Sequence, residues 1–170
     1  AVGAANWHLQ SEAIAAMEQA RAEGIDVEFD CYPYVAGSSV LTQLLPQSAL
    51  DGGISALMER LRDAKKRQLI RDEVQRSIPW RWSDIHISSV GSEANLGAIG
   101  KTLEEIANES RCEPVDGMLD LLLQEEGNAN MLCFNQSNEN RRGSLSHPFG
   151  TVISGRVYVE WSLHRRVRGA

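Results

Sequence analysis

The chain has 170 residues, 42% of them hydrophobic and 24% charged, and a formal net charge of −6. These values predict a soluble globular protein of one domain, and the negative charge argues against a general nucleic-acid binder. The three cysteines form no CxxC pair, so we expect no zinc knuckle, no disulfide framework and a reducing, cytoplasmic setting. No signal peptide and no membrane-spanning apolar run is visible. Because the chain starts at Ala1 instead of Met, we expect an excised or processed segment.

The first forty residues predict a helix followed by a strand. Ser11 suits the N-cap of a helix that ends near Glu23, and Gly24 is a natural stop. The strict alternation of Ile25–Cys31 predicts a strand, and Pro33 ends it. A loop, Tyr-Val-Ala-Gly-Ser-Ser, is expected next.

A helical block is predicted over about residues 43–80. It contains a short helix after Pro46 and two apolar stripes at helical spacing, formed by Ile54, Leu57, Met58 and Leu61 and then by Leu69, Ile70 and Val74. Asp63 can cap the second of these longer helices. The block separates two strands by more than a usual crossover, so we interpret it as a helical insertion.

Strands and helices alternate again after this block. Residues 84–90 alternate like a strand, and Thr102 begins a capping box with Glu105. Pro114 suits the first turn of a helix that stops at Gly127.

The residues after Gly127 predict a further strand, helix and strand. A strand is expected at 130–134, a short helix capped by Ser137, and a short buried strand at 151–154. Repeated alternation of strand and helix favours an α/β fold with parallel strands.

Two motifs were weighed for phosphate and metal binding. Asn95–Thr102 ends in Gly-Lys-Thr, but a P-loop needs glycine where Asn95 stands, so we disfavour it. We consider three hypotheses for the function of this chain. The weakest is a nucleotide or nucleic-acid binder that uses this Gly-Lys-Thr or the arginine-rich C-terminal stretch. The four histidines show neither HxH nor HExxH spacing, and by themselves indicate no metal centre.

Phe29–Ser39, Phe-Asp-Cys-Tyr-Pro-Tyr-Val-Ala-Gly-Ser-Ser, is the most informative stretch. It places an acidic residue, two tyrosines around a proline, and a Gly-Ser loop at the end of a predicted strand. A tyrosine hydroxyl there can polarise a carbonyl or stabilise an oxyanion. A packed corner between strand and loop explains the same residues equally well.

At this stretch the sequence resembles the N-acyl-D-amino-acid deacylase (D-aminoacylase) family of the amidohydrolase superfamily. The stretches that carry the resemblance are GAANWHLQSEAIAAMEQARAEGIDVEFDCYPYVAGSSVLTQLLP, NLGAIGKTLEEIANESRCEPVDGMLDLLLQEEG and FNQSNENRRGSLSHPFGTVIS. The resemblance implies a zinc-dependent (β/α)₈ TIM barrel of several hundred residues. The chain would then be a middle-to-late portion of one barrel domain, with residues 43–80 as a helical insertion within it.

The resemblance also implies roles for individual residues. Tyr32 would polarise the scissile carbonyl, Ser38 and Gln136 would line the substrate pocket, and Arg166 would hold the substrate carboxylate. In the family a metal-bound hydroxide attacks the amide of an N-acyl-D-amino acid.

The sequence departs from the family at its metal site. Gly155 stands where the family has an aspartate that serves as metal ligand and general base, and glycine can do neither. The family's other ligands have no counterpart in the chain, so we expect the chain to keep no zinc and to be inactive alone.

The leading hypothesis is therefore a portion of a metal-dependent hydrolase that cleaves the amide bond of N-acyl-D-amino acids. The alternative is a non-catalytic, degenerate barrel fragment that acts as a binding or assembly module. Exposed strand edges of an incomplete barrel favour self-association, so we expect oligomers in that case.

Overall fold

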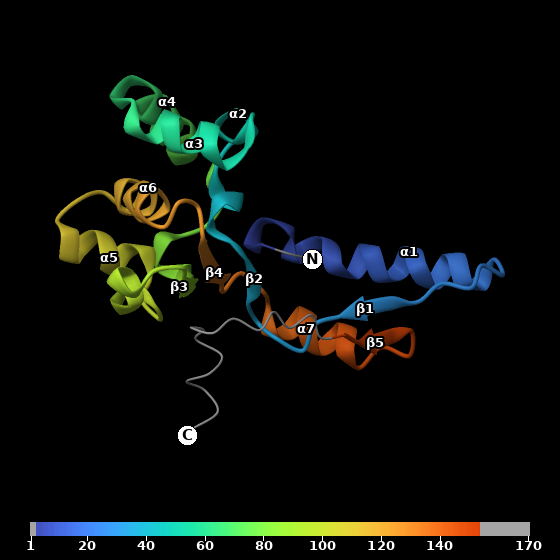
Figure 1. The fold of residues 1–170 in the computed structure, drawn as a ribbon. Coiled ribbons are helices and arrows are strands. Elements are labelled where there is room, and N and C mark those ends of the chain that lie inside the picture. Colours follow the sequence, from blue (N-terminus) through green and yellow to red (C-terminus); the bar gives the residue numbers. More distant parts are fainter. Residues whose placement is uncertain (1–2, 154–170) are drawn as a thin grey trace. The chain divides into compact units, whose positions relative to one another are not determined.

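The computed structural model describes residues 3–153, so Gly155 and Arg166 lie outside the described residues. The helices of this part are α1 (Gln10–Ala22), α2 (Gln47–Leu50), α3 (Gly53–Arg62), α4 (Ala64–Ser77), α5 (Leu103–Ser110), α6 (Pro114–Gln124) and α7 (Asn138–Leu145) (Figure 1). The strands are β1 (Phe29–Cys31), β2 (Gly37–Val40), β3 (Ile85–Val90), β4 (Ala129–Cys133) and β5 (Gly150–Val152). Short 3₁₀ helices lie at Ala4–Leu9, Leu41–Leu44, Trp82–Asp84 and Glu93–Ala98. The predicted mixture of helices and strands is confirmed.

The chain divides into two compact units. One contains residues 3–37 and 134–153 of the described chain, and we call it the split unit. The other contains residues 38–133, and we call it the central unit. Each holds its own sheet: β1 and β5 form the first, and β2, β4 and β3 form the second in that order.

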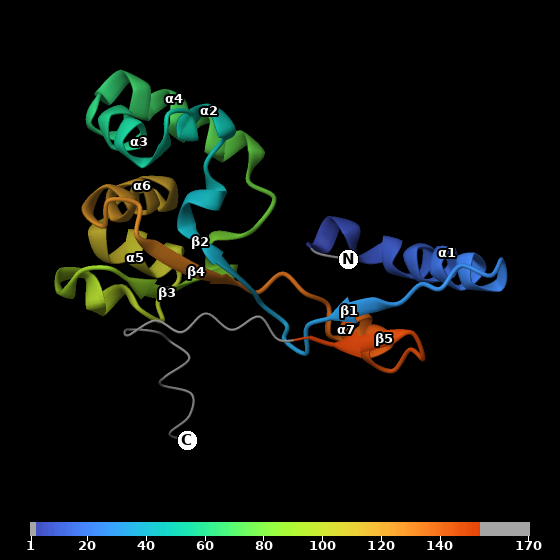
Figure 2. The same ribbon diagram turned by 45° about the vertical axis from the view of Figure 1, so that its right-hand side comes forward.

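The central unit contains the hydrophobic core. Helix α6 contributes a continuous apolar surface to this core, because Val115, Met118, Leu119 and Leu122 are all at most 1% exposed. It packs against α5 on one side and against the α3 and α4 pair on the other (Figures 1 and 2). Side chains of β3 and β4, such as Ile85, Ile87 and Met131, complete the packing.

The sheet of the central unit corrects the expectation of parallel strands. β3 and β4 are antiparallel, with Ile85 opposite Cys133 and Val90 opposite Ala129. The end of β3 therefore lies beside the start of β4. The intervening chain, with α5 and α6, returns to the end of the sheet that it left. It is a return connection rather than the crossover that parallel strands require.

Local signals for helix starts are confirmed at three helices. Asp63 caps α4 by accepting from the amides of Lys65 and Lys66. Thr102 and Glu105 form the complete capping box of α5. Ser137 caps α7.

Other expectations from the sequence are wrong in detail. Ser11 lies inside α1, because a 3₁₀ helix already leads the chain into it and Leu9 is the N-cap. Leu69 is 69% exposed, although Ile70 and Val74 of the same predicted stripe are buried. The strand predicted at Ile25–Cys31 is shortened to β1.

The split unit pairs β1 with β5 in parallel, and α7 packs against both strands. Helix α1 contributes Glu18, which lies 3.1 Å from Nε2 of His147, and Arg21, which stacks on the ring of Phe149. The last strand is exposed at Thr151 and Val152, not buried as predicted. No helix among residues 3–153 has both the length and the apolar character needed to cross a membrane.

Candidate functional site

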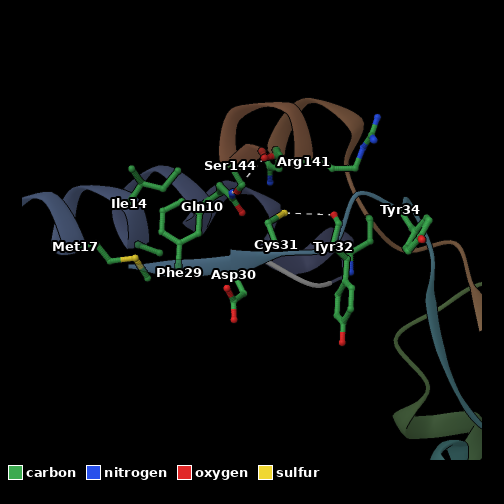
Figure 3. A pocket seen from close by; sticks show the side chains of 13 residues that line it. Gln10, Ile14, Met17, Phe29, Asp30, Cys31, Tyr32, Tyr34, Arg141 and Ser144 are labelled. Carbon is green, nitrogen blue, oxygen red and sulfur yellow. Dashed lines mark hydrogen bonds between the residues drawn. The ribbon is translucent and has the colours of Figure 1, made fainter. Parts of the chain in front are cut away.

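The two faces of β1 differ in what covers them. Successive side chains of a strand point to opposite faces. Phe29 and Cys31 point toward α1 and α7, whereas Asp30 and Tyr32 point to the opposite side (Figure 3). We call the side that carries Asp30 and Tyr32 the open face of β1. The alternation of half-buried and exposed residues along 29–32 follows this division.

Tyr32 lies directly after β1, where the chain leaves the sheet. Its side chain is 54% exposed, and its hydroxyl makes no hydrogen bond to other described residues. The proline that follows restricts Tyr32 to extended backbone conformations. Tyr32 is thus an available hydroxyl donor on a restrained backbone, which is the property required to polarise a carbonyl.

Contacts from the start of α7 hold the loop after Tyr32. The amide of Gln136 donates to the carbonyl of Val35 over 3.2 Å. Nη1 of Arg141 donates to the carbonyl of Pro33 over 2.8 Å. Two segments more than a hundred residues apart in sequence therefore meet at this loop.

The predicted pocket residues have different positions. Gln136 is half-buried and lies at the loop that carries Tyr32. Ser38 is exposed on β2 and belongs to the central unit, so the structure gives its place only within that unit. The assignments of Gly155 and Arg166 remain predictions.

A depression of about 270 Å³ lies along β1 and the loop that follows it. Its lining includes Met17 of α1 and Phe29 of β1, and it also includes Tyr32, Gln136 and Arg141. Figure 3 shows the side chains of Asp30 and Tyr32 on the side of β1 opposite the ring of Phe29, although both residues border the depression. Tyr32 therefore borders both the depression and the open face, and we interpret its surroundings as the candidate site.

The described residues do not fit a metal ion. No group of three or more His, Cys, Asp or Glu side chains among them could hold one. Nδ1 of His86 lies 3.3 Å from the carbonyl of Gly100, as befits a structural histidine. Burial raises the pKa of the Cys112 thiol, and it raises that of Cys133 to about 11, so both are poor nucleophiles at neutral pH.

The segment that imitates a P-loop is already occupied by the chain itself. The amides of Gly100 and Lys101 donate to the carbonyls of Ile87 and Ala98, and the amide of Thr102 donates to the carboxylate of Glu105. Nζ of Lys101 is 2.6 Å from Glu109. The donors that a phosphate would need are therefore engaged, which argues against nucleotide binding here.

Comparison with solved structures identifies enzymes with the same fold. The chain is similar to an N-acyl-D-glutamate deacylase from Bordetella bronchiseptica, solved with zinc and a phosphonate mimic of the tetrahedral intermediate, with a TM-score of 0.56 and 19% identity. It is similar to D-aminoacylase with a TM-score of 0.52 and 22% identity, and to a D-aminoacylase structure that addresses its binuclear metal centre with a TM-score of 0.53 and 22% identity. Each match covers 89% of this chain and 23% of the other. No family model and no curated protein sequence matches the chain.

These matches confirm, at the level of the fold, the resemblance drawn from the sequence. The chain spans about a quarter of the length of each matched enzyme. The sequence assigned roles to Tyr32 and Gln136, which stay predictions, and it assigned none to Asp30 or Arg141. The alternation of Phe29–Tyr32 carried a signal for Asp30, because it places Asp30 on the same side as Tyr32. No local signal pointed to Arg141, whose contact lies 108 residues away.

Proposed function

We propose that this chain is the part of an N-acyl-D-amino-acid deacylase that carries the carbonyl-polarising tyrosine and part of the substrate pocket. The observation that carries the proposal is the exposed Tyr32 hydroxyl on the open face of β1. The fold shared with D-aminoacylases supports the chemical class of the substrate. In a barrel of this kind the reacting groups come from the C-terminal ends of parallel strands, and Tyr32 directly follows β1, which pairs in parallel with β5.

Tyr32 would act by donating its hydroxyl proton in a hydrogen bond to the acyl carbonyl oxygen. The same bond strengthens as that oxygen gains negative charge in a tetrahedral intermediate. Gln136, beside the loop, would contact the substrate's side chain. Arg166 would pair with its carboxylate, as the sequence resemblance implies.

Hydrolysis also needs an activated water, and the described residues bring together no ligand set for a metal ion. The proposal for this chain is therefore confined to binding and polarising the substrate. We expect the chain alone to bind weakly and to show no turnover.

Binding of N-acetyl-D-glutamate tests the proposal. We expect amide signals near Tyr32 and Gln136 to shift in two-dimensional NMR spectra when this ligand is added at millimolar concentration. The Tyr32→Phe variant should bind about three to ten times more weakly, because one hydrogen bond to the carbonyl is lost.

N-acetyl-L-glutamate and the Tyr34→Phe variant are the matched controls. The L-enantiomer should give smaller shifts, and removal of the neighbouring hydroxyl should leave the affinity for the D-enantiomer unchanged. Equal shifts with both enantiomers, or an affinity that does not depend on the Tyr32 hydroxyl, would contradict the proposal.

A second candidate function is an assembly module. Val152 is 62% exposed and Ile153 is 41% exposed, both at the small sheet of the split unit. Uncovered apolar strands favour association with another chain. We expect the mass measured by light scattering to rise with protein concentration, and the Val152→Lys variant to reduce that rise. A constant monomer mass would exclude this function.

A further inference from the structure

We infer that Arg141 is a positioning residue that holds in place the backbone that carries Tyr32. Arg141 received no role from the sequence, and the fold alone does not assign one. Its effect on ligand binding rests on the proposed function, whereas its effect on Tyr32 itself does not.

The start of α7 places Arg141 beside the tyrosine loop. The Ser137 hydroxyl accepts from the amide of Asn140, and the amide of Arg141 donates to the carbonyl of Ser137. Arg141 therefore sits on the first turn of a capped helix, where its backbone is well defined. Its guanidinium spans from this turn to the loop.

The two terminal nitrogens of the guanidinium bond to different parts of the chain. Nη2 donates to Oδ1 of Asn138 over 3.0 Å, which anchors the group to α7. Nη1 donates to the carbonyl of Pro33 over 2.8 Å, which anchors the loop. Because both of its terminal nitrogens are bonded, the planar guanidinium links α7 to the loop. We call this link the strut.

This strut holds the backbone on the C-terminal side of Tyr32. The ring of Pro33 fixes its own φ and restricts the backbone of Tyr32. Arg141 holds the carbonyl oxygen of Pro33, so the backbone is bonded to α7 directly after the residue that follows Tyr32. The backbone that carries the tyrosine ring is consequently held on one side by the pairing of β1 with β5 and on the other by Arg141.

The geometry suits positioning better than direct binding of substrate. Both terminal nitrogens of Arg141 already donate to the chain, and Nε is buried without a partner in the described part of the chain. Arg141 forms no ion pair with any carboxylate of residues 3–153. A substrate carboxylate would have to displace contacts that hold the loop.

The test uses the full chain labelled with 3-fluorotyrosine. Its three tyrosines give three fluorine signals, which single Tyr→Phe variants assign. In Arg141→Met, which keeps an unbranched aliphatic side chain but removes the donors, we expect the Tyr32 signal to shift and broaden. Arg141→Lys should give an intermediate effect, because an ammonium can keep only one end of the strut. Arg142→Met, an exposed neighbour on α7, is the matched control and should leave the signal unchanged.

Binding of N-acetyl-D-glutamate adds the functional readout. Arg141→Met should weaken binding about tenfold, and adding Tyr32→Phe should cause little further loss, because both changes act through the same hydroxyl. If the wild-type chain does not bind this ligand, the proposed function fails while the fluorine signals still decide the role of Arg141. An unchanged Tyr32 signal in a folded Arg141→Met variant would overturn the inference. So would unfolding of the split unit by both Arg141 variants, since Arg141 would then be a general stability residue.

Discussion

Glu125 is a buried carboxylate that holds the loop after β3 by four hydrogen bonds, from Gly91 N, Ser92 N, Ser92 Oγ and Asn95 Nδ2. The Glu125→Gln variant replaces one acceptor oxygen by an amide that must face at least one of these donors. We expect this change to lower the free energy of unfolding by about 2–3 kcal/mol, because buried donors lose their partner. Urea unfolding measures the loss, and Glu126→Gln, an exposed neighbour, should change it by less than about 0.5 kcal/mol.

The same carboxylate predicts a pH dependence. Burial alone would raise the pKa of Glu125, but the hydrogen bonds outweigh it and lower the pKa below its usual value of 4.5. A lowered pKa in the folded state stabilises the fold above the unfolded pKa, and this stability is lost as the pH falls through the folded pKa. The difference in unfolding free energy between wild type and Glu125→Gln should therefore be constant near neutral pH and shrink below about pH 4.5. A difference that does not change on acidification would contradict this account.

Residues whose roles depend on nearby sequence could be predicted, and those with distant partners could not. Asp63, Thr102 and Ser137 cap helices through amides two or three residues away, so the sequence alone identified them. Glu125 bonds to residues 30 to 34 positions away, and only the folded chain brings them together.

At the scale of elements, local periodicity predicted where most helices and strands lie, but not how they pair. The alternation of strands and helices favoured parallel pairing, which holds for β1 with β5 but not for β3 with β4. Whether a connection crosses over or returns depends on how its helices pack on the sheet. Leu69 shows the same limit, because its spacing fits the apolar stripe but its side chain does not face the core.

The candidate site was likewise predictable in part. Tyr32 and Gln136 were identified from motifs, and their segments do meet at one loop. The direction of Tyr32 depends on the alternation along β1 and on which face the helices cover, and the second of these is a tertiary property. The contact of Arg141 with Pro33 joins α7 to a loop near the start of the chain, so no sequence window contained it.

At the scale of the whole molecule, the two units differ in how much apolar surface they bury. The buried hydrophobic residues of the described chain all lie between Leu41 and Cys133, within the central unit. In the split unit, the buried residues are Asn135 and Ser144, and α1 contains none. Because burial of apolar surface is the main favourable term in folding, the split unit should be the less stable of the two.

Hydrogen exchange measured by mass spectrometry tests this difference on a matched pair of helices. α1 has 13 residues and α4 has 14, so their lengths give neither an advantage. α4 buries Ile70 and Val74 against the core, whereas α1 buries no side chain. We expect the amides of α1 to exchange about a hundredfold faster than those of α4, because local opening costs less where few apolar contacts break. Equal protection would mean that the split unit is stabilised by contacts other than apolar burial, and the central unit would then not be the independent folding core.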